Sequence, residues 1–261
     1  MNAASRSRAK RIRIIASLRY GLRLTLRHLQ SLVPGTVAFY LPEWAAYLGL
    51  WGGGQTLLVT VYKALVGCWL LWHALQLSDR ETRSSRFHEP VLPAPGYLGR
   101  FLGSTLLFWG VLAATLWPVW RLAGGTWVGP LVGADWLRHP GAWAPEQALR
   151  ALACAAAALP AGLWTVYGWF HGYYVADEGQ GPWESMVSSF HAVRGAFWRC
   201  VLFLGVIAAI NALGLALWVV GIFLAFPVTL MATTYVHLEL KRQTVRRRVR
   251  TRRTAGAGGP G

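Results

Sequence analysis

The sequence is poor in acidic charge and in the residue patterns that carry catalysis or metal binding. It has 10 Asp and Glu against 26 Lys and Arg. Charged residues make up 14% of the chain, compared with roughly 25% in an ordinary soluble domain. No Gly-x-Ser-x-Gly elbow, His-Glu-x-x-His helix or phosphate-binding loop occurs. We therefore expect no enzyme, no cofactor and no metal site.

Cysteine is also scarce. Cys68, Cys154 and Cys200 lie singly in apolar runs, and an odd number of separated cysteines provides no disulfide framework. None of them has the spacing of a metal ligand pair. We therefore interpret all three as small buried apolar residues.

Apolar residues are abundant, at 54% of the chain, and 15 of the 261 residues are Trp, which favours membrane–water interfaces. A bilayer core needs roughly 20 apolar residues in a helix. The run from Arg199 to Leu238 is twice that length, which predicts two helices with a turn near 218–221. The sequence thus predicts an all-α polytopic transmembrane helix bundle with six spans. These are residues 34–51, 56–77, 101–120, 148–175, 198–217 and 220–239.

The span over 34–51 is the weakest, because it contains Pro34, Pro42 and Glu43. Five spans with a re-entrant segment are the alternative. With six spans and the N-terminus inside, 22 of the 26 Lys and Arg residues fall on the inner side, which is the positive-inside pattern. Five spans would move the eight basic residues of the C-terminal segment to the wrong face. We therefore predict a multi-pass protein of a bacterial inner membrane with both termini cytoplasmic.

The chain divides into three parts on this interpretation. Residues 1–30 form a basic amphipathic segment, 31–240 the transmembrane domain, and 241–261 a basic tail that we expect to be disordered because it has no apolar face. The tail could bind nucleic acid, but attraction to anionic lipid, worth about 1 kcal/mol per basic residue, explains it more simply. We expect no nucleic-acid partner.

Residues 13–29 are predicted to form an amphipathic helix that lies among the headgroups of anionic lipid. One side is apolar, with a helical repeat. It consists of Ile15, Leu18, Leu22, Leu26 and Leu29. The opposite side is basic and consists of Arg13, Arg19, Arg23 and Arg27. Packing against a partner helix is the alternative use of such a pattern.

A second interfacial helix is predicted over 182–197. It begins after Gly181 with a proline, which the first turn of a helix tolerates. One side is apolar and should face lipid, notably through Trp183 and Phe190. The other side carries Glu184 and several serines, which we expect to be exposed to water.

Glu43 and Lys63 are the most informative polar residues within the spans. Each lies ten positions from Gly53 in the turn between the first two spans, so a helical hairpin places both about 15 Å from the turn. Charged groups at that depth are costly, which predicts that the two face each other or a polar cavity. A structural ion pair and a proton or ion pathway are both compatible with this placement.

Two further sets of polar residues are candidates. Asn211 and Pro227 are equidistant from the predicted last turn, so the Asn amide could bond a carbonyl that the proline leaves without a donor. A bond within its own helix is the alternative for Asn211. His171, Tyr173, Tyr174, Asp177 and Glu178 gather at the inner end of the fourth span. Ordinary interfacial chemistry explains these better than a metal site.

The stretch 176–240 resembles a known pattern. Its signature is Gly181-Pro182-Trp183-Glu184-Ser185, followed by Gly195, Phe197, Trp198, Asn211, Gly214, Pro227 and Tyr235. It is similar to the C-terminal half of uncharacterised bacterial multi-pass membrane proteins related to the membrane domain attached to some glycerophosphodiester phosphodiesterases. The resemblance implies an all-helical membrane domain with an interfacial helix before a final hairpin. It implies no reaction, since the active site of those enzymes belongs to a separate soluble domain.

These observations together favour a non-enzymatic accessory or scaffold protein. Its expected partners are membrane lipids, anionic headgroups above all, and a further membrane protein is possible as a partner. The alternative is a small transporter or channel with a polar path near Glu43 and Lys63.

Overall fold

A computed structural model describes residues 12–47, 56–82, 95–122 and 145–256, and the regular structure within these ranges is all helical. The all-α class is thereby confirmed for the described residues. The helices are α1 (Ile14–Arg27), α2 (Leu29–Tyr47), α3 (Thr56–Thr82), α4 (Pro95–Leu122), α6 (Pro145–Gly168), α7 (His171–Glu178), α8 (Pro182–Arg194), α9 (Phe197–Ala216) and α10 (Trp218–Gly256).

Four helical stretches among the described residues are long and apolar enough to cross a membrane. They are Gly96–Val119, Leu152–Glu178, Phe197–Ala216 and Phe223–Gln243. The protein thus has the features of a multi-pass membrane protein. The first two predicted spans are not among the four. Both are helical where described, as α2 and α3, and the end of the first, from residue 48, lies outside the described residues.

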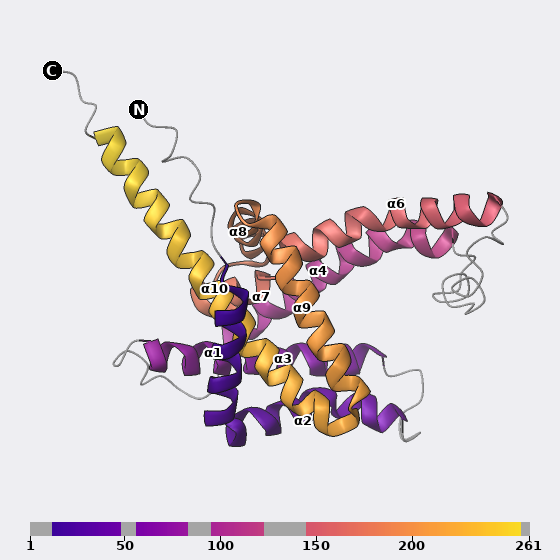
Figure 1. The fold of residues 1–261 in the computed structure, drawn as a ribbon, viewed down its shortest axis with the longest axis horizontal. Helices are drawn as coiled ribbons and strands as arrows, with labels where there is room; N and C mark the ends of the chain where they lie inside the picture. The colour runs from indigo at the N-terminus through magenta and orange to yellow at the C-terminus, as the bar shows by residue number, and fades with distance from the viewer. Residues whose placement is uncertain (1–11, 48–55, 83–94, 123–144, 257–261) are drawn as a thin grey trace.

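The helices pair into hairpins (Figure 1). The largest buried cluster among the described residues is here called the hub. Pairs α2–α3, α4–α6 and α9–α10 pack side by side, and α1 lies along α10. The hub joins α7 and α8 to parts of α9 and α10. Its large members are Phe170, Tyr173, Tyr174, Val193, Phe203, Ile207, Val236 and Leu240.

Burial differs sharply between the hub and the hairpin α4–α6. Within an 18-residue apolar window of each stretch, 56% of the residues are buried in Phe223–Gln243, against 17% in Gly96–Val119 and 11% in Leu152–Glu178. Figure 1 shows α4 and α6 extending together away from the hub. Their exposed side chains are large and apolar, including Trp109, Trp117 and Leu159. Exposure to water would cost roughly 25 cal/mol per Å² of such surface, whereas hydrocarbon solvates it at no cost.

The last predicted hairpin is observed, with α9 and α10 separated at Leu217 rather than at 218–221. Two glycines allow this tight connection. A Cβ on Gly214 would lie 2.5 Å from the Cβ of Ala225, and one on Gly221 would collide with the carbonyl of Gly214. The absence of a side chain at both positions therefore lets the two helices touch next to the turn.

Three predicted boundaries differ from the structure. The span over 148–175 is broken after Gly168, and α7 begins at His171. The interfacial helix 182–197 ends at Arg194, and a short turn separates it from α9. The segment 241–261, expected to be disordered, is helical as far as Gly256. Arginine is a good helix former, and extending a helix that packing already holds needs no new nucleus.

Candidate functional site

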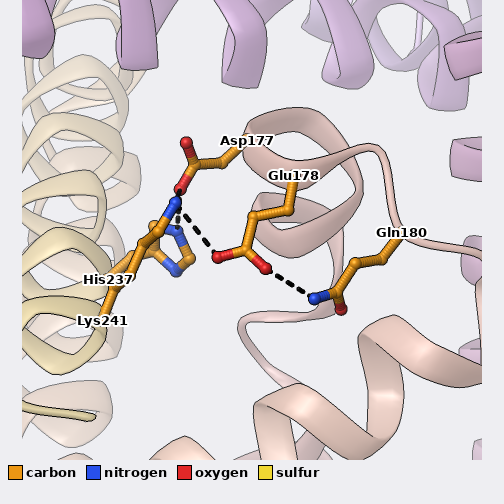
Figure 2. A network of polar contacts seen from close by, with 5 residues as sticks. All are labelled: Asp177, Glu178, Gln180, His237 and Lys241. Carbon is orange, nitrogen blue, oxygen red and sulfur yellow. Dashed lines mark hydrogen bonds and ion pairs between the residues drawn. The ribbon is translucent and has the colours of Figure 1, made fainter. Parts of the chain in front are cut away.

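A set of charged and polar side chains connects the end of α7 to α10 (Figure 2). The Oδ2 atom of Asp177 lies 2.6 Å from the Nζ of Lys241 and 3.2 Å from the Nε2 of His237. Lys241 also contacts the Oε1 of Glu178 at 3.0 Å. The amide of Gln180 donates to the Oε2 of the same Glu178 at 2.6 Å. We call these five residues the polar cluster.

Local backbone geometry explains how the acidic residues reach α10. Gly179 ends α7 with φ 63°, a left-handed conformation that favours glycine, and its N–H donates to the carbonyl of Val175 at 2.9 Å. The guanidinium of Arg100, from α4, donates to the Gly179 carbonyl. The chain then enters α8, where the Glu184 carboxylate accepts a bond from the Gly181 N–H at 3.2 Å. Asp177 and Glu178 are thus held at a capped helix end.

The two basic members come from one face of α10, since residues four apart in a helix are neighbours. His237 is fully buried, whereas the Lys241 side chain is 31% exposed and that of Asp177 is 22% exposed. The rings of Tyr173 and Tyr174 lie 5.2 Å and 4.8 Å from the imidazole, centroid to centroid. The polar cluster therefore runs from a closed aromatic environment to the edge of the hub.

This arrangement can act as an ionic lock between α7 and α10. A buried carboxylate needs partners that compensate its lost hydration, and Asp177 has two from the same helix. The Nδ1 atom of His237 has no hydrogen-bond partner among the described residues. No three His, Cys, Asp or Glu side chains in the described ranges are placed to hold a metal ion.

The sequence grouped the inner-end residues but did not indicate their partners on α10, which are His237 for three of them and Lys241 for Asp177 and Glu178. Tyr173, Tyr174 and Asp177 all contact His237. His171 does not join them. Its ring stacks on Phe108, 4.9 Å away at 14°, and its Nδ1 pairs with the carbonyl of Gly168 at 2.8 Å.

Lys63 and Glu43 lie on adjacent helices, α3 and α2. The ammonium of Lys63 lies over the rings of Phe39 and Tyr40, at 5.1 Å and 6.0 Å from their centroids. Such cation–π contacts stabilise a charge in apolar surroundings. The side chain of Glu43 lies outside the described residues, so its distance to Lys63 stays a prediction.

Asn211, on α9, contacts α10 at Thr229, two residues after Pro227. Its Oδ1 atom accepts a hydrogen bond from the Thr229 hydroxyl at 3.2 Å, and that hydroxyl is also 2.9 Å from the Phe226 carbonyl. Pro227 is buried inside α10. The structure thus brings the amide of Asn211 to the region of the proline through a threonine that sequence reasoning did not single out.

Ser189 of α8 forms hydrogen bonds with backbone groups at the break between α6 and α7. Its hydroxyl donates to the Tyr167 carbonyl at 2.6 Å and accepts from the Phe170 N–H at 3.2 Å. Ser185 and Ser189 are fully buried, although the sequence placed both on the water-facing side of the helix. Backbone groups freed by a helix break in an apolar environment need such a partner, which explains why the serine side of α8 faces inward.

The predicted lipid-contact residues are mostly at the surface. Arg19, Arg23 and Arg27 are exposed on α1, and Arg13 is exposed just before it. On α8, Trp183 is exposed and Phe190 is half-buried.

The helix α1 packs against α10 through a third side that the sequence pattern did not reveal. Ser17, Gly21, Leu24 and Thr25 are buried there. A Cβ on Gly21 would collide with the carbonyl of Val228 and lie 2.9 Å from the backbone nitrogen of Ala232. This close approach leaves Ile15, Leu22 and Leu26 exposed beside the arginines.

Comparison with models of known protein families, with curated proteins and with solved structures finds no match to the chain. The geometry therefore defines a class only: the part of the chain that the structure describes is all helical and has four candidate membrane spans. The resemblance of residues 176–240 stays an expectation from the sequence.

Proposed function

We propose that this protein is a non-enzymatic scaffold of a bacterial inner membrane that gathers anionic lipid at the cytoplasmic face. In this proposal it crosses the membrane six times, and both termini are cytoplasmic. The single observation that supports the proposal best is the surface of α1. That helix is fixed to α10 by its small residues and still presents an apolar side and a basic side together.

The apolar side and the basic side of α1 suit a membrane interface. Ile15, Leu22 and Leu26 are 72%, 51% and 60% exposed, which is unfavourable in water. The exposed Arg19 and Arg23 lie next to this side of the helix. A helix of this kind places its apolar side at the acyl boundary and its cations among the phosphates. Each basic residue near an anionic surface contributes about 1 kcal/mol.

The packing of the hub supports a scaffold role. It holds α1, α7, α8 and α10 together, so the lipid-binding surface is fixed relative to the spans. Each charged member of the polar cluster contacts another member, which suits a structural role. The cation–π contacts of Lys63 suit a structural role better than a transport path. Ion flux into proteoliposomes that Glu43→Gln abolishes would instead establish the transporter.

A lipid-dependent stability measurement tests the proposal. Thermal unfolding of the full chain in mild detergent is followed with added phosphatidylglycerol or phosphatidylcholine. We expect phosphatidylglycerol to raise the Tm and the double variant Arg19→Gln/Arg23→Gln to lose part of that rise. The matched control is Arg121→Gln/Arg138→Gln, which removes the same charge from the predicted outer side.

Two results would contradict the proposal. Equal stabilisation by both lipids in the wild type would show that the headgroup charge is irrelevant. Equal losses in the two double variants would show that α1 has no special role. The topology is tested separately with reporter fusions: placing residue 130 and the C-terminus in one compartment would exclude six spans.

A further inference from the structure

A shallow hollow lies between α6 and α8, outside the polar cluster. Its volume is about 290 Å³, and it is lined by Tyr167, Phe190, His191 and Arg194. The rings of Tyr167 and Phe190 stack 4.9 Å apart at 14°. The ring of Trp164 also packs against Phe190, 5.6 Å away between centroids. The floor of the hollow is therefore apolar and held in place by ring packing.

The rim of the hollow is basic. Arg194 is exposed in the last turn of α8 and forms no ion pair with any residue in the described ranges. His191, one turn earlier on α8, is also exposed. None of the four lining residues is acidic. Glu184 is ten residues away, about 15 Å along the helix. A guanidinium in this setting suits a phosphate group.

An apolar stripe leads from the hollow along α6. Leu159, Leu163 and Tyr167 are spaced by four residues and therefore share one side of the helix. Leu159 is 65% exposed and Leu163 is 48% exposed. The stripe covers nine residues, and their eight steps of about 1.5 Å give about 12 Å, which is the length of a substantial part of an acyl chain. A free phosphate would use the basic rim but not the stripe.

We propose that the hollow binds one anionic phospholipid. The phosphate lies at Arg194, the glycerol region lies on the rings of Tyr167 and Phe190, and an acyl chain follows Leu163 and Leu159. This site rests on the proposed membrane scaffold and adds to it a specific lipid position, separate from the broader surface of α1.

The site is tested by photo-crosslinking in the full chain, purified in mild detergent. The probe is phosphatidylglycerol with a diazirine in one acyl chain, and adducts are mapped by mass spectrometry. We expect saturable adducts within residues 159–167, competed by unlabelled phosphatidylglycerol but not by phosphatidylcholine or inorganic phosphate. Arg194→Gln should raise the concentration needed for half-saturation about tenfold, the size expected for losing a charge-assisted bond. Leu163→Gln should also raise it while Arg194 is intact.

Controls separate this site from the function on which it rests. Arg121→Gln removes one exposed charge elsewhere and should leave the adducts unchanged. The pair Arg19→Gln/Arg23→Gln should also leave them unchanged, because α1 is a different surface. Adducts that ignore Arg194→Gln, or that inorganic phosphate displaces, would overturn the lipid site. If the α1 pair still lowered lipid stabilisation in that case, the scaffold proposal would stand without the site.

Discussion

The ionic lock at Asp177 offers the sharpest test of the packing between α7 and α10. Asp177→Asn keeps the size of the side chain and removes its charge. Two bonds to basic side chains are affected, at 2.6 Å to Lys241 and at 3.2 Å to His237. A hydrogen bond with a charged partner contributes roughly 1.5–3 kcal/mol. Because Lys241 is about a third exposed and still contacts Glu178, we expect a total loss of about 2 kcal/mol.

Thermal unfolding in detergent, followed by Trp fluorescence, measures this loss. One kcal/mol shifts the Tm by roughly 2–4 °C in a chain of about this length. Asp177→Asn should therefore lower the Tm by about 4–8 °C. The Lys241→Met change, alone and combined with Asp177→Asn, completes a double-mutant cycle. The two losses should be clearly less than additive, since both substitutions remove the same contact.

Glu178→Gln is the matched control for Asp177→Asn. It also neutralises one carboxylate that contacts Lys241, but Glu178 is exposed, and exposed ion pairs contribute under about 1 kcal/mol. Its effect on the Tm should be at most half as large. The reasoning is refuted if both variants lose the same stability, or if Asp177→Asn unfolds within 1 °C or so of the wild type.

Three more substitutions test other parts of the fold. Ser189→Ala removes the partner of two backbone groups at the α6–α7 break, and we expect a loss of about 1–3 kcal/mol in detergent unfolding. Gly21→Leu introduces a side chain where α1 meets the backbone of α10, so limited proteolysis should cut α1 faster. Glu43→Gln should destabilise the protein, and adding Lys63→Met should recover much of that loss.

Controls and contrary outcomes for these three are equally specific. Ser188→Ala, at the neighbouring position on α8, should change stability by less than about 0.5 kcal/mol. Gly205→Leu should leave proteolysis unchanged, because no described atom lies within 4 Å of a Cβ there. A Gly21 variant cut no faster than wild type would argue against the close α1–α10 contact. Additive losses from Glu43→Gln and Lys63→Met would exclude a direct pair.

Sequence patterns were sufficient to locate most helices, because length and hydropathy are local properties. The last hairpin illustrates this, since a 40-residue apolar run between Arg199 and Leu238 cannot be a single span. The start of α8 at Pro182 was equally predictable from the sequence. The break after Gly168 could not be predicted, since Ser189, which bonds its backbone groups, lies 19 and 22 residues from them on another helix.

The pairing of Asp177 with His237 and Lys241 could not be predicted from the sequence for a related reason. It joins positions 60 and more residues apart, and α10 is apolar on several sides around these residues. Such a helix has no single apolar stripe that would indicate which side packs inward. The spacing of the two basic residues by four was the one available signal, and it identifies a shared face without naming the partner.

The helix α1 packs through a side that its amphipathic pattern does not mark. In water, the Leu and Ile side of a helix is the side that packs, since burial removes it from solvent. Lipid is as apolar as leucine, so that driving force disappears, and close packing of small residues decides which side meets the neighbouring helix. The side of α1 with Ser17 and Gly21 accordingly meets α10, and Ile15 and Leu22 stay exposed. If α1 lay in water, Leu22→Gln would cost nothing in stability; at a bilayer surface, it should weaken association with phosphatidylglycerol while leaving the Tm in lipid-free detergent unchanged.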